Sequence, residues 1–573
     1  MNAVCGSPTS AETLRSAERR SASAREGLPH SPGPIRSFTR PTQFYRRLLH
    51  VDDPGASFRI ALSGRSAGSH DATTLTYREL TAAAAGVAAD LAALGVAPGD
   101  RVALVAPYGP HWVATFLGVL SAGAVAVPLD PNLAAPDLAH RLQELRAVVV
   151  LFGAGTGDRV NEAALVAGAT ARPVGTAAAE PPAEPLAVPR RPEHPAVVVY
   201  TSGSTGTAKP VTMSWANLVY QVEAVTQRVV APDAVLVSVL PAHHSFELVI
   251  GCLCPLYVGA RIHYPGSMLP ADIVAAIAEQ RATGLVVVPL LLAALRRRIE
   301  ADLAAATRAS RAWVAAVGRL PMPLRRLGLP SLHARFGGRL RHFFVGGAPL
   351  DPDLARYFER LGFQVCQGYG MTEASPVIAV NSLRDNRTGS VGRPLPGTEV
   401  RTVHGEILVR GPGVTPGYWG RPDLTARAVD GDGWLSTGDR GHLDEDGYLF
   451  VTGRVKNLVV LPSGEKVQPE DVERVLDRSP MVGACCVVGL PAPHGEELVA
   501  VVAPSDTTRA DLPDPVERDA ALTREVRRLT AELAPHQRPG RIVVRSHDLP
   551  RTASAKVSRP RVRELLESGG GTA

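Results

Sequence analysis

Cysteine is scarce in this sequence, with six residues among 573. None of the six forms a C-x-x-C pair, and no histidine cluster lies beside them. This spacing argues against a disulfide framework and against a structural zinc site. We therefore expect buried, reduced thiols in a cytoplasmic protein.

Lysine is also scarce. The chain has 61 basic residues, of which 57 are arginine and only four are lysine, at positions 209, 456, 466 and 556. A codon bias that turns surface lysines into arginines accounts for such a ratio. Lysine carries a compact charge on a thin stem, whereas arginine is a wide planar fork. The four lysines are therefore candidates for positions at which arginine cannot serve.

Neither net charge nor a long apolar run dominates the chain. The net charge is +6, and residues 1–40 contribute +3 of it through six arginines and three glutamates, so the remainder is nearly balanced. That balance argues against a dedicated nucleic-acid surface. The uncharged stretch Trp112–Leu129 contains Gly123 and Pro128. It predicts the helix and second strand of a strand–helix–strand unit and no transmembrane segment.

Short apolar strands alternate with helical patterns along most of the chain, which predicts an α/β fold. We expect a large domain over residues 41–453, with mostly parallel sheets, helices and a small β-barrel-like part. A second, smaller α+β domain is expected over residues 454–573. It includes a helix from about Pro469 to Arg478, which begins with proline and two acids. Residues 1–40 have few large apolar side chains and are expected to form a disordered tail.

A run of small hydroxyl residues and glycines follows the predicted strand Val197–Tyr200. The run comprises Thr201, Ser202, Gly203, Ser204, Thr205 and Gly206, and Lys209 follows it. Glycines let a backbone approach a ligand closely, hydroxyls donate hydrogen bonds, and an amine attracts negative charge. The run therefore predicts a triphosphate site. It differs from the P-loop, in which glycine precedes the lysine and Ser or Thr follows it.

This run resembles the phosphate loop of the acyl-adenylate-forming, or AMP-binding, enzyme superfamily. Four other segments resemble most of all the long-chain fatty acyl-CoA synthetases and related AMP-dependent acid–CoA ligases: His244–Glu247, Gly346–Leu350, Arg387–Arg393 and Lys456–Leu461. The resemblance covers nearly the whole chain. Further similar segments follow in the expected order: Phe344–Leu350, Gln367–Glu373, Ser436–Asp439, Gly453–Lys456 and Pro550–Val557. In the last segment Ala555 replaces the family's usual glycine, which would alter the bend of that loop.

The resemblance implies a nucleotide site and a magnesium site. Lys209 and its loop would hold the β- and γ-phosphates of ATP, Thr372 would contact the α-phosphate, and Glu373 would bind Mg²⁺. Asp439 and Arg454 would hold the ribose, and Tyr369 would stack on the adenine. The other residues expected at the nucleotide are Gly347, Ala348, Pro349, Gly368, Gly370 and Met371.

The resemblance also implies a substrate pocket and a domain rotation between two half-reactions. His244, Ser245 and Gly346 would line the acyl pocket. Lys556 would bridge the substrate carboxylate and the α-phosphate during adenylation. The C-terminal domain would then turn about Lys456 and bring Gly464 to a thiol tunnel, while Lys466 is expected at the surface.

The implied activity is adenylation of a carboxylic acid by ATP, followed by acyl transfer to a thiol. The acid is expected to have an apolar body, either fatty-acid-like or aromatic. Only residues 557–573 follow Lys556, so we expect a separate acceptor, which is CoA or the phosphopantetheine of a carrier protein. An adenylating ligase with a non-thiol acceptor, either amide-forming or nitrite-activating, remains the alternative.

Overall fold

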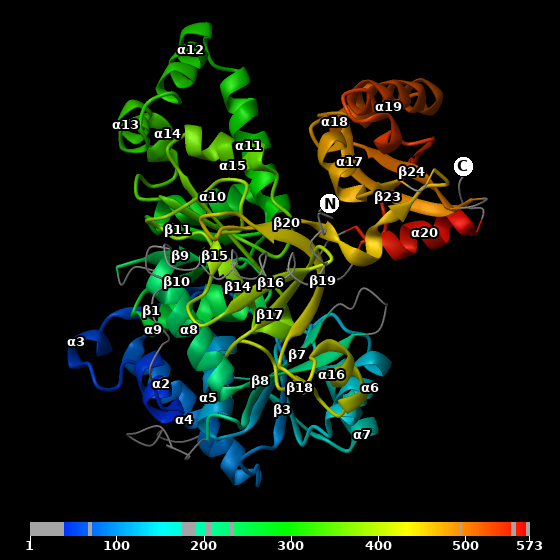
Figure 1. The fold of residues 1–573 in the computed structure, drawn as a ribbon. Coiled ribbons are helices and arrows are strands. Elements are labelled where there is room, and N and C mark those ends of the chain that lie inside the picture. The colour runs from blue at the N-terminus through cyan, green and yellow to red at the C-terminus, as the bar shows by residue number, and fades with distance from the viewer. Residues whose placement is uncertain are drawn as a thin grey trace, which may run out of the picture.

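The computed structural model describes residues 39–66, 71–174, 191–201, 208–229, 233–463, 465–492, 495–551 and 557–568. These residues form a large N-terminal α/β domain and a smaller C-terminal domain, which lies at the upper right of Figure 1 in orange and red. The α/β fold expected from the alternating pattern is confirmed. Within the described residues, no helix is long and apolar enough to cross a bilayer.

The first sheet of the large domain has a parallel centre and antiparallel edges. In spatial order its strands are β15 (Arg393–Pro394), β14 (Val377–Val380), β13 (Gln364–Gly370), β12 (His342–Val345), β11 (Gly284–Val287), β9 (Val235–Val237), β10 (Arg261–Tyr264), β1 (Ile60–Gly64) and β2 (Thr73–Thr76). Strands β13 to β1 in this order pair in parallel. The carboxyl ends of β12 and β13 are therefore adjacent, and two of the predicted nucleotide segments begin there.

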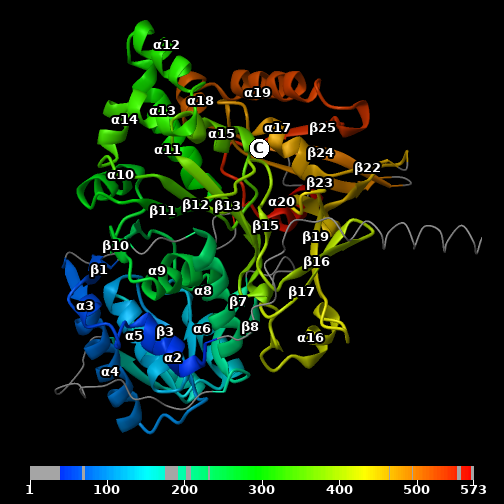
Figure 2. The same cartoon turned by 60° about the vertical axis from the view of Figure 1, so that its left-hand side comes forward.

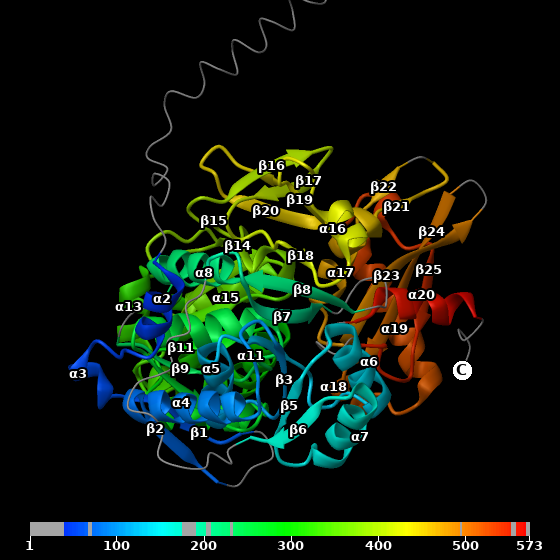
Figure 3. The same ribbon diagram turned by 90° about the horizontal axis from the view of Figure 1, so that it is seen from below.

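The second sheet is also parallel except at one edge. Its strands are, in order, β18 (Gly417–Tyr418), β8 (Lys209–Ser214), β7 (Pro195–Thr201), β4 (Val125–Pro128), β3 (Arg101–Val105), β5 (Val149–Phe152) and β6 (Thr170–Pro173). Strands β8 and β18 are the antiparallel members. Figure 3 shows α6 (Ala135–Leu145) and α7 (Gly157–Ala167) at the outer side of this sheet, where they bury its apolar residues.

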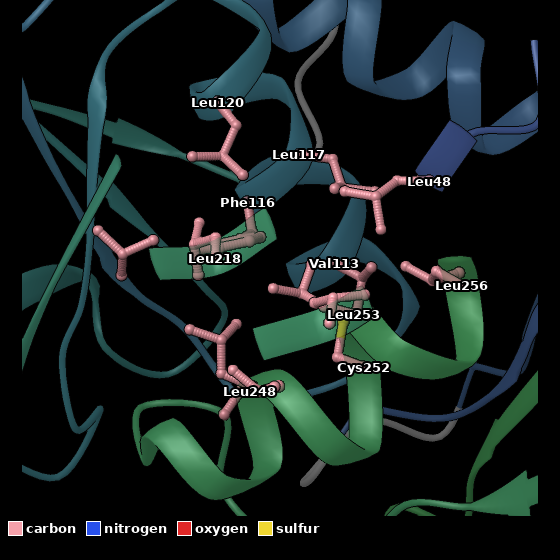
Figure 4. Packing of buried hydrophobic residues seen from close by; sticks show 14 of the residues in the cluster. Leu48, Val113, Phe116, Leu117, Leu120, Leu218, Leu248, Cys252, Leu253 and Leu256 are labelled. Atoms are coloured by element: carbon pink, nitrogen blue, oxygen red, sulfur yellow. The ribbon is translucent and has the colours of Figure 1, made fainter. Parts of the chain in front are cut away.

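The main core lies between these two sheets and is filled by helices. Helices α5 (Pro110–Ser121) and α8 (Trp215–Val229) contribute Phe116, Leu117 and Leu218, which are fully buried (Figure 4). Leu248 and Leu253 pack with them from a π-helix at Glu247–Leu253. Helix α5 is buried nearly all round, which explains why Trp112–Leu129 lacks charge although it spans no membrane.

The remaining helices of the large domain connect its strands and pack around its sheets. They are α2 (Pro41–Leu48), α3 (Pro54–Ser57), α4 (Tyr77–Ala93), α9 (Cys254–Tyr257), α10 (Pro270–Glu279), α11 (Pro289–Ala304), α12 (Arg308–Val317), α13 (Met322–Gly328), α14 (Pro330–Arg335), α15 (Pro352–Arg360) and α16 (Pro422–Ala428). Most begin with proline, whose fixed φ suits a first helical position. Helix α4 begins instead with a capping box, in which Thr76 and Glu79 bond each other's backbone N–H.

An antiparallel sheet leads from the large domain towards the C-terminal one. Its strands are β16 (Glu399–Val403), β17 (Glu406–Arg410), β19 (Leu435–Leu443) and β20 (Leu449–Arg454). The change from parallel to antiparallel strands near residue 390 agrees with the sequence pattern. Figure 2 shows β16, β17 and β19 below the C-terminal elements.

The C-terminal domain is α+β, as its sequence predicts. The strands are β21 (Val459–Val460), β22 (Lys466–Val467), β23 (Val482–Ala492), β24 (Gly495–Pro504) and β25 (Arg541–Val544). The helices are α17 (Pro469–Leu476), α18 (Asp506–Asp511), α19 (Pro515–Thr530) and α20 (Arg559–Glu567). Helix α17 begins at the predicted proline and ends two residues before the predicted Arg478.

A partly buried ion cluster joins α20 to α17 inside this domain. Arg559 lies 2.6 Å from Glu473 and 3.1 Å from Glu470. Glu473 also accepts the backbone N–H of Val487 at 2.7 Å, and Arg559 donates to the carbonyl of the same residue. Burial raises the pKa of Glu473, while the Arg559 guanidinium opposes that shift.

We predict that Arg559→Ala destabilises the C-terminal domain by about 1.5–3 kcal/mol, because it removes the charged hydrogen bonds to Glu470 and Glu473 and leaves the partly buried Glu473 carboxylate with only the Val487 N–H. Faster hydrogen–deuterium exchange in β23 and α17 would measure the loss. Arg563→Ala is the matched control, because Arg563 pairs with Glu567 at the surface and such pairs contribute less than about 1 kcal/mol. Equal exchange in the two variants would contradict the cluster's role.

Candidate active site

The predicted phosphate loop connects two neighbouring antiparallel strands. Thr201 at the end of β7 lies opposite Lys209 at the start of β8. Residues Ser202, Gly203, Ser204, Thr205 and Gly206 lie outside the described residues. The sequence analysis did not anticipate β8, because the Lys209–Ser214 segment combines a proline with small and polar residues. Strand β8 brings Lys209 back beside β7 and pairs onward with β18.

Tyr418 of β18 stands between Lys209 and Glu373. The Lys209 ammonium lies 5.4 Å from the centre of the Tyr418 ring. The Tyr418 hydroxyl donates a 2.8 Å hydrogen bond to the buried Glu373 carboxylate. Burial, and then the charge of Glu373, raises the pKa of Tyr418. One tyrosine therefore links the lysine of the phosphate loop to the carboxylate that the resemblance assigns to Mg²⁺.

Glu373 is placed by a short turn after β13. The turn is a 3₁₀ helix at Thr372–Ala374, and the Glu373 carbonyl accepts the N–H of Thr415 at 2.8 Å. Thr372 lies beside the predicted acyl segment, since its hydroxyl is 3.0 Å from that of Ser245. A residue expected at the α-phosphate and one expected at the acyl pocket are thus in direct contact.

The glycines after β12 allow the acyl segment to approach. A Cβ atom at Gly346 would lie 2.6 Å from the ring of Phe246, so any side chain there would have to displace that ring. Gly347 has φ +79°, in the region that favours glycine. Ala348 is half-buried and Pro349 is exposed. The His244 ring is tilted against that of His243 with ring centres 4.4 Å apart, and burial lowers the pKa of His243.

Asp439 holds together three parts of the large domain. Its carboxylate accepts a 2.8 Å hydrogen bond from the Tyr369 hydroxyl and lies 3.0 Å from Nε of Arg454. Asp439 and Arg454 also face each other across β19 and β20. Burial raises the pKa of Tyr369, and the Asp439 charge adds to the shift. The Asp439 side chain is 9% exposed and that of Arg454 is 55% exposed, so the pair lies at a boundary with solvent.

One of the two glycines that flank Tyr369 is required by the backbone beside it. A Cβ at Gly370 would lie 1.8 Å from the carbonyl oxygen of Pro376, just before the paired strand β14. At Gly368 a Cβ would make only ordinary contacts. Met371 follows the strand and is half-buried. The segment can therefore form β13 and its close turn only with glycine at position 370.

The predicted pivot Lys456 is exposed in a short 3₁₀ helix at Val455–Asn457. Its neighbours are tied to α17. Gln468 donates to the Arg454 carbonyl at 3.2 Å, and Asn457 donates to Glu470 at 2.5 Å. Glu470 in turn accepts from Arg559. A series of hydrogen bonds therefore connects Arg454, the predicted ribose ligand, with Arg559, which follows the Lys556 segment.

Two further predicted residues, Gly464 and Lys556, lie outside the described residues. The ends of the Lys556 segment are described. Arg551 pairs with Val557 in an isolated antiparallel bridge, and the N–H of Ser558 donates to the Pro550 carbonyl at 2.7 Å. Lys466, expected at the surface, is exposed in β22.

The sequence analysis assigned no role to Glu247 or Tyr418. Tyr418 follows a glycine after a long irregular segment, so only the pairing of β18 with β8 shows where it lies. Glu247 gave a stronger signal, because it is a single acid at the start of the apolar run Leu248–Tyr257. A charged side chain within such a run is rarely fully buried unless it has partners.

Glu247 is fully buried at the start of the π-helix, next to the acyl segment. One carboxylate oxygen accepts from the Ser238 hydroxyl, and Oε2 has no hydrogen-bond partner. A Cβ at Gly251 would lie 2.0 Å from the other oxygen, Oε1, so glycine makes room for the carboxyl group. Burial raises the pKa of Glu247 to about 8, although the Ser238 hydrogen bond opposes the shift. Glu247 is therefore a neutral acid at neutral pH.

A magnesium ion fits the donors that the site offers. Glu373 is a hard oxygen ligand, and the Tyr418 hydrogen bond occupies only one of its oxygens. The described residues contain no cluster of three or more His, Cys, Asp or Glu side chains that could hold a metal by itself. This agrees with the way Mg²⁺ usually binds, through one or two carboxylates together with substrate phosphates.

Comparisons with known proteins identify the family. The AMP-binding enzyme family matches residues 57–419, and the AMP-binding enzyme C-terminal domain matches residues 471–556. A feruloyl-CoA synthase of an Amycolatopsis species is 35% identical over 465 residues, which cover 77% of this chain and 86% of that protein. The long-chain-fatty-acid–CoA ligase FadD15 of Mycobacterium bovis is 29% identical over 468 residues, 75% of this chain and 77% of its own.

A solved structure extends the similarity to the fold. ATP-bound MatB from Rhodopseudomonas palustris has a TM-score of 0.75 and 26% identity, and the match covers 92% of this chain and 99% of that one. The chain therefore belongs to the AMP-binding enzyme family. Within it, the chain is an acyl-adenylate-forming acid–CoA ligase, for which ATP and CoA are the implied co-substrates.

The buried Glu247 predicts a pH-dependent stability. In the unfolded chain its carboxyl ionises near the ordinary pKa of 4.5, whereas in the folded chain it keeps its proton up to about pH 8. The folded state thus holds the extra proton, and the stability from the neutral acid is present below pH 4.5 and is lost as pH rises through 8. Relative to Glu247→Gln, the wild type should lose about 1.4 kcal/mol per pH unit in this window.

Urea unfolding at several pH values would measure this difference. All five tryptophans lie in the large domain, so their emission reports its unfolding. Glu300→Gln serves as the control, since Glu300 pairs with Arg296 at the surface. A constant difference between wild type and Glu247→Gln across the pH range would show that Glu247 is ionised in the folded protein.

Proposed function

We propose that this enzyme adenylates a carboxylic acid with an apolar body, with Mg²⁺ and release of pyrophosphate, and then transfers the acyl group to a thiol. The observation that carries the proposal is the placement of Lys209 on β8, Glu373 in the turn after β13 and Asp439 on β19. Tyr418 contacts the first two, and Tyr369 bonds to the third. Together these three residues offer a cation for phosphates, a carboxylate for a metal and a carboxylate for a diol.

Asp439 is proposed to hold the ribose of ATP. A carboxylate has two acceptor oxygens and suits two vicinal hydroxyls. In the structure those oxygens are held by the Tyr369 hydroxyl and Arg454 Nε. The Arg454 side chain is half-exposed and can move aside, and Tyr369 can place its ring beside the base. A ligand that arrives from solvent would meet the exposed Arg454 first and then the buried Asp439 behind it.

Lys209 is proposed to hold the terminal phosphates, and the hydroxyl loop before it to donate to their oxygens. Glu373 would hold Mg²⁺, which when bound neutralises charge on the phosphates and on the departing pyrophosphate. Tyr418 orients Glu373 through its hydrogen bond and keeps the carboxylate beside Lys209. Such a site acts by positioning and by electrostatic stabilisation, because the protein forms no covalent bond to the substrate.

The acid is proposed to lie beside Ser245 and Gly346. The Ser245–Thr372 contact joins this pocket to the α-phosphate residue, so a carboxylate held there would face the atom that it attacks. A carboxylate oxygen would form a bond to the α-phosphorus, and the bond to the pyrophosphate oxygen would break. Lys556 would stabilise the charge of this step.

For the second half-reaction we propose that residues 454–573 move as a domain about Lys456. That motion would remove Lys556 and bring the Gly464 turn to the thiol, with residues 41–453 as the fixed domain. The contacts of Gln468 with Arg454 and of Asn457 with Glu470 lie within residues 454–573 and support their movement as one body. Acyl transfer then joins the thiol sulfur to the carbonyl carbon and releases AMP. The thiol belongs to CoA or to a carrier protein, and the enzyme would act in the cytoplasm.

An aromatic propenoic acid is the first candidate substrate class, supported by the 35% identity to a feruloyl-CoA synthase. A long-chain fatty acid is the second candidate, supported by the 29% identity to the FadD15 ligase. Both classes have the apolar body that the proposal requires.

A panel of acids separates these possibilities. We expect acid-dependent pyrophosphate release with hydroxycinnamic acids, and thioester product only when CoA is added. Preference for straight-chain fatty acids would support the second class. Pyrophosphate release that requires an amine in place of CoA would support an amide-forming ligase. No acid-dependent pyrophosphate release with any member of either class would contradict the proposal.

The ribose assignment predicts a specific loss in Asp439→Asn. Hydrogen bonds to a charged group contribute about 1.5–3 kcal/mol each, so the KM for ATP should rise at least about tenfold. Wild type should also discriminate against 2′-deoxy-ATP, and the variant should lose much of that discrimination. Asp430→Asn is the control, because Asp430 only caps a turn by accepting the N–H groups of Asp432 and Trp434. Unchanged discrimination in Asp439→Asn would assign the ribose to another residue.

A further inference from the structure

Helices α12 and α13 project from the large domain. They follow α11 and form the top of the large domain in Figure 1, and α12 is again uppermost in Figure 2. Val317 is the only buried residue of α12, and α13 has none. Two successive helices with so little buried surface are stabilised weakly by packing, because most helical stability in proteins comes from a buried face.

The exposed faces of these helices carry large apolar side chains. Trp313 is 59% exposed and Leu327 is 76% exposed, with Leu324 and Leu320 less so. The Trp313 indole N–H donates to the Gly328 carbonyl at 2.8 Å, which brings the ring to the end of α13 that also carries Leu327. Scattered exposed leucines are ordinary, but Trp313 of α12, Leu320 between the helices, and two leucines of α13 together form an apolar tip.

The same region concentrates positive charge. Residues 303–350 contain eight arginines and no Asp, Glu or Lys, so their charge of +8 exceeds the +6 of the whole chain. Three of these arginines donate to backbone carbonyls: Arg311 to Ala304, Arg325 to Leu320 and Glu359, and Arg326 to Gly338 and Leu340. Arg325 also interacts with the charge of the Glu359 carboxylate. Two pair with acids outside the segment, Arg335 with Asp302 and Arg339 with Asp233.

We propose that α12 and α13 dock on the surface of a lipid bilayer that contains anionic lipids. Tryptophan and leucine on one side of a short helix, with arginines around them, are typical of segments that lie in the bilayer interface. Guanidinium groups match lipid phosphates geometrically and attract them electrostatically. The region is a projecting tip and not a groove, which suits a planar surface better than an acidic protein partner. The proposal is independent of the enzymatic function.

Sedimentation of the full-length protein with vesicles would test the proposal. We expect binding to vesicles of phosphatidylcholine with phosphatidylglycerol, weak binding to phosphatidylcholine alone, and a decrease with salt. Arg308→Gln with Arg319→Gln should weaken binding roughly tenfold, since each basic residue near an anionic surface contributes measurably. Trp313→Ser with Leu327→Ser should weaken it by a similar factor and abolish the blue shift of tryptophan emission.

Matched controls lie on other faces of the molecule. Leu165→Ser with Val516→Ser changes side chains that are 84% and 78% exposed, and Arg524→Gln with Arg527→Gln removes two exposed charges of α19. These variants should bind as the wild type does, and all variants should keep wild-type pyrophosphate release without vesicles. A protein that does not sediment with anionic vesicles would overturn the proposal. That result is the one expected if the partner of the tip is an acidic protein. Binding that the tip variants leave unchanged, as the arginines of residues 1–38 could produce, would also overturn it.

Discussion

The site depends on a single constraint: a buried carboxylate must be held by partners from separate parts of the chain. Asp439 meets Tyr369 at the end of β13 and Arg454 at the end of β20. A carboxylate with only 9% of its side chain exposed is costly without such partners. The hydrogen bond and ion pair that stabilise the Asp439 carboxylate therefore hold the antiparallel sheet against the parallel one. The C-terminal elements begin directly after Arg454. The Asp439–Arg454 contact therefore fixes the point at which the chain leaves the large domain.

A second carboxylate organises the phosphate side in the same way. Glu373 is buried, and Tyr418 bonds it from a strand that reaches the site only through β8. The Lys209 ammonium lies 5.4 Å from the centre of the same tyrosine ring. One neutral aromatic residue therefore contacts both the cation and the carboxylate that a magnesium-bound triphosphate needs.

Much of this arrangement could be predicted from local sequence. The buried strands are short apolar runs, and helices such as α17 begin with proline and acids. Both signals come from residues adjacent in sequence, so both could be read without knowing the fold. The roles given to Lys209, Glu373 and Asp439 came from motifs and remain predictions, although the structure brings all three residues to one region. Strand β8 and Tyr418 could not be predicted, because their pairing depends on a contact between residues about 200 positions apart. The positive charge of the apolar tip could not be seen in the net charge of the whole chain, because the other residues are nearly neutral in sum. It becomes visible only when the charged residues of 303–350 are counted alone and the structure shows that their helices project.

The central claim is that a carboxylate of the substrate attacks the α-phosphate of ATP. Turnover of an acid labelled with ¹⁸O in its carboxyl group tests it most directly, with mass spectrometry of the nucleotide and phosphate products. Adenylation followed by thioester formation must leave one ¹⁸O atom in AMP and none in pyrophosphate. Formation of ADP, with the label in inorganic phosphate, would show attack at the γ-phosphate and would contradict the account.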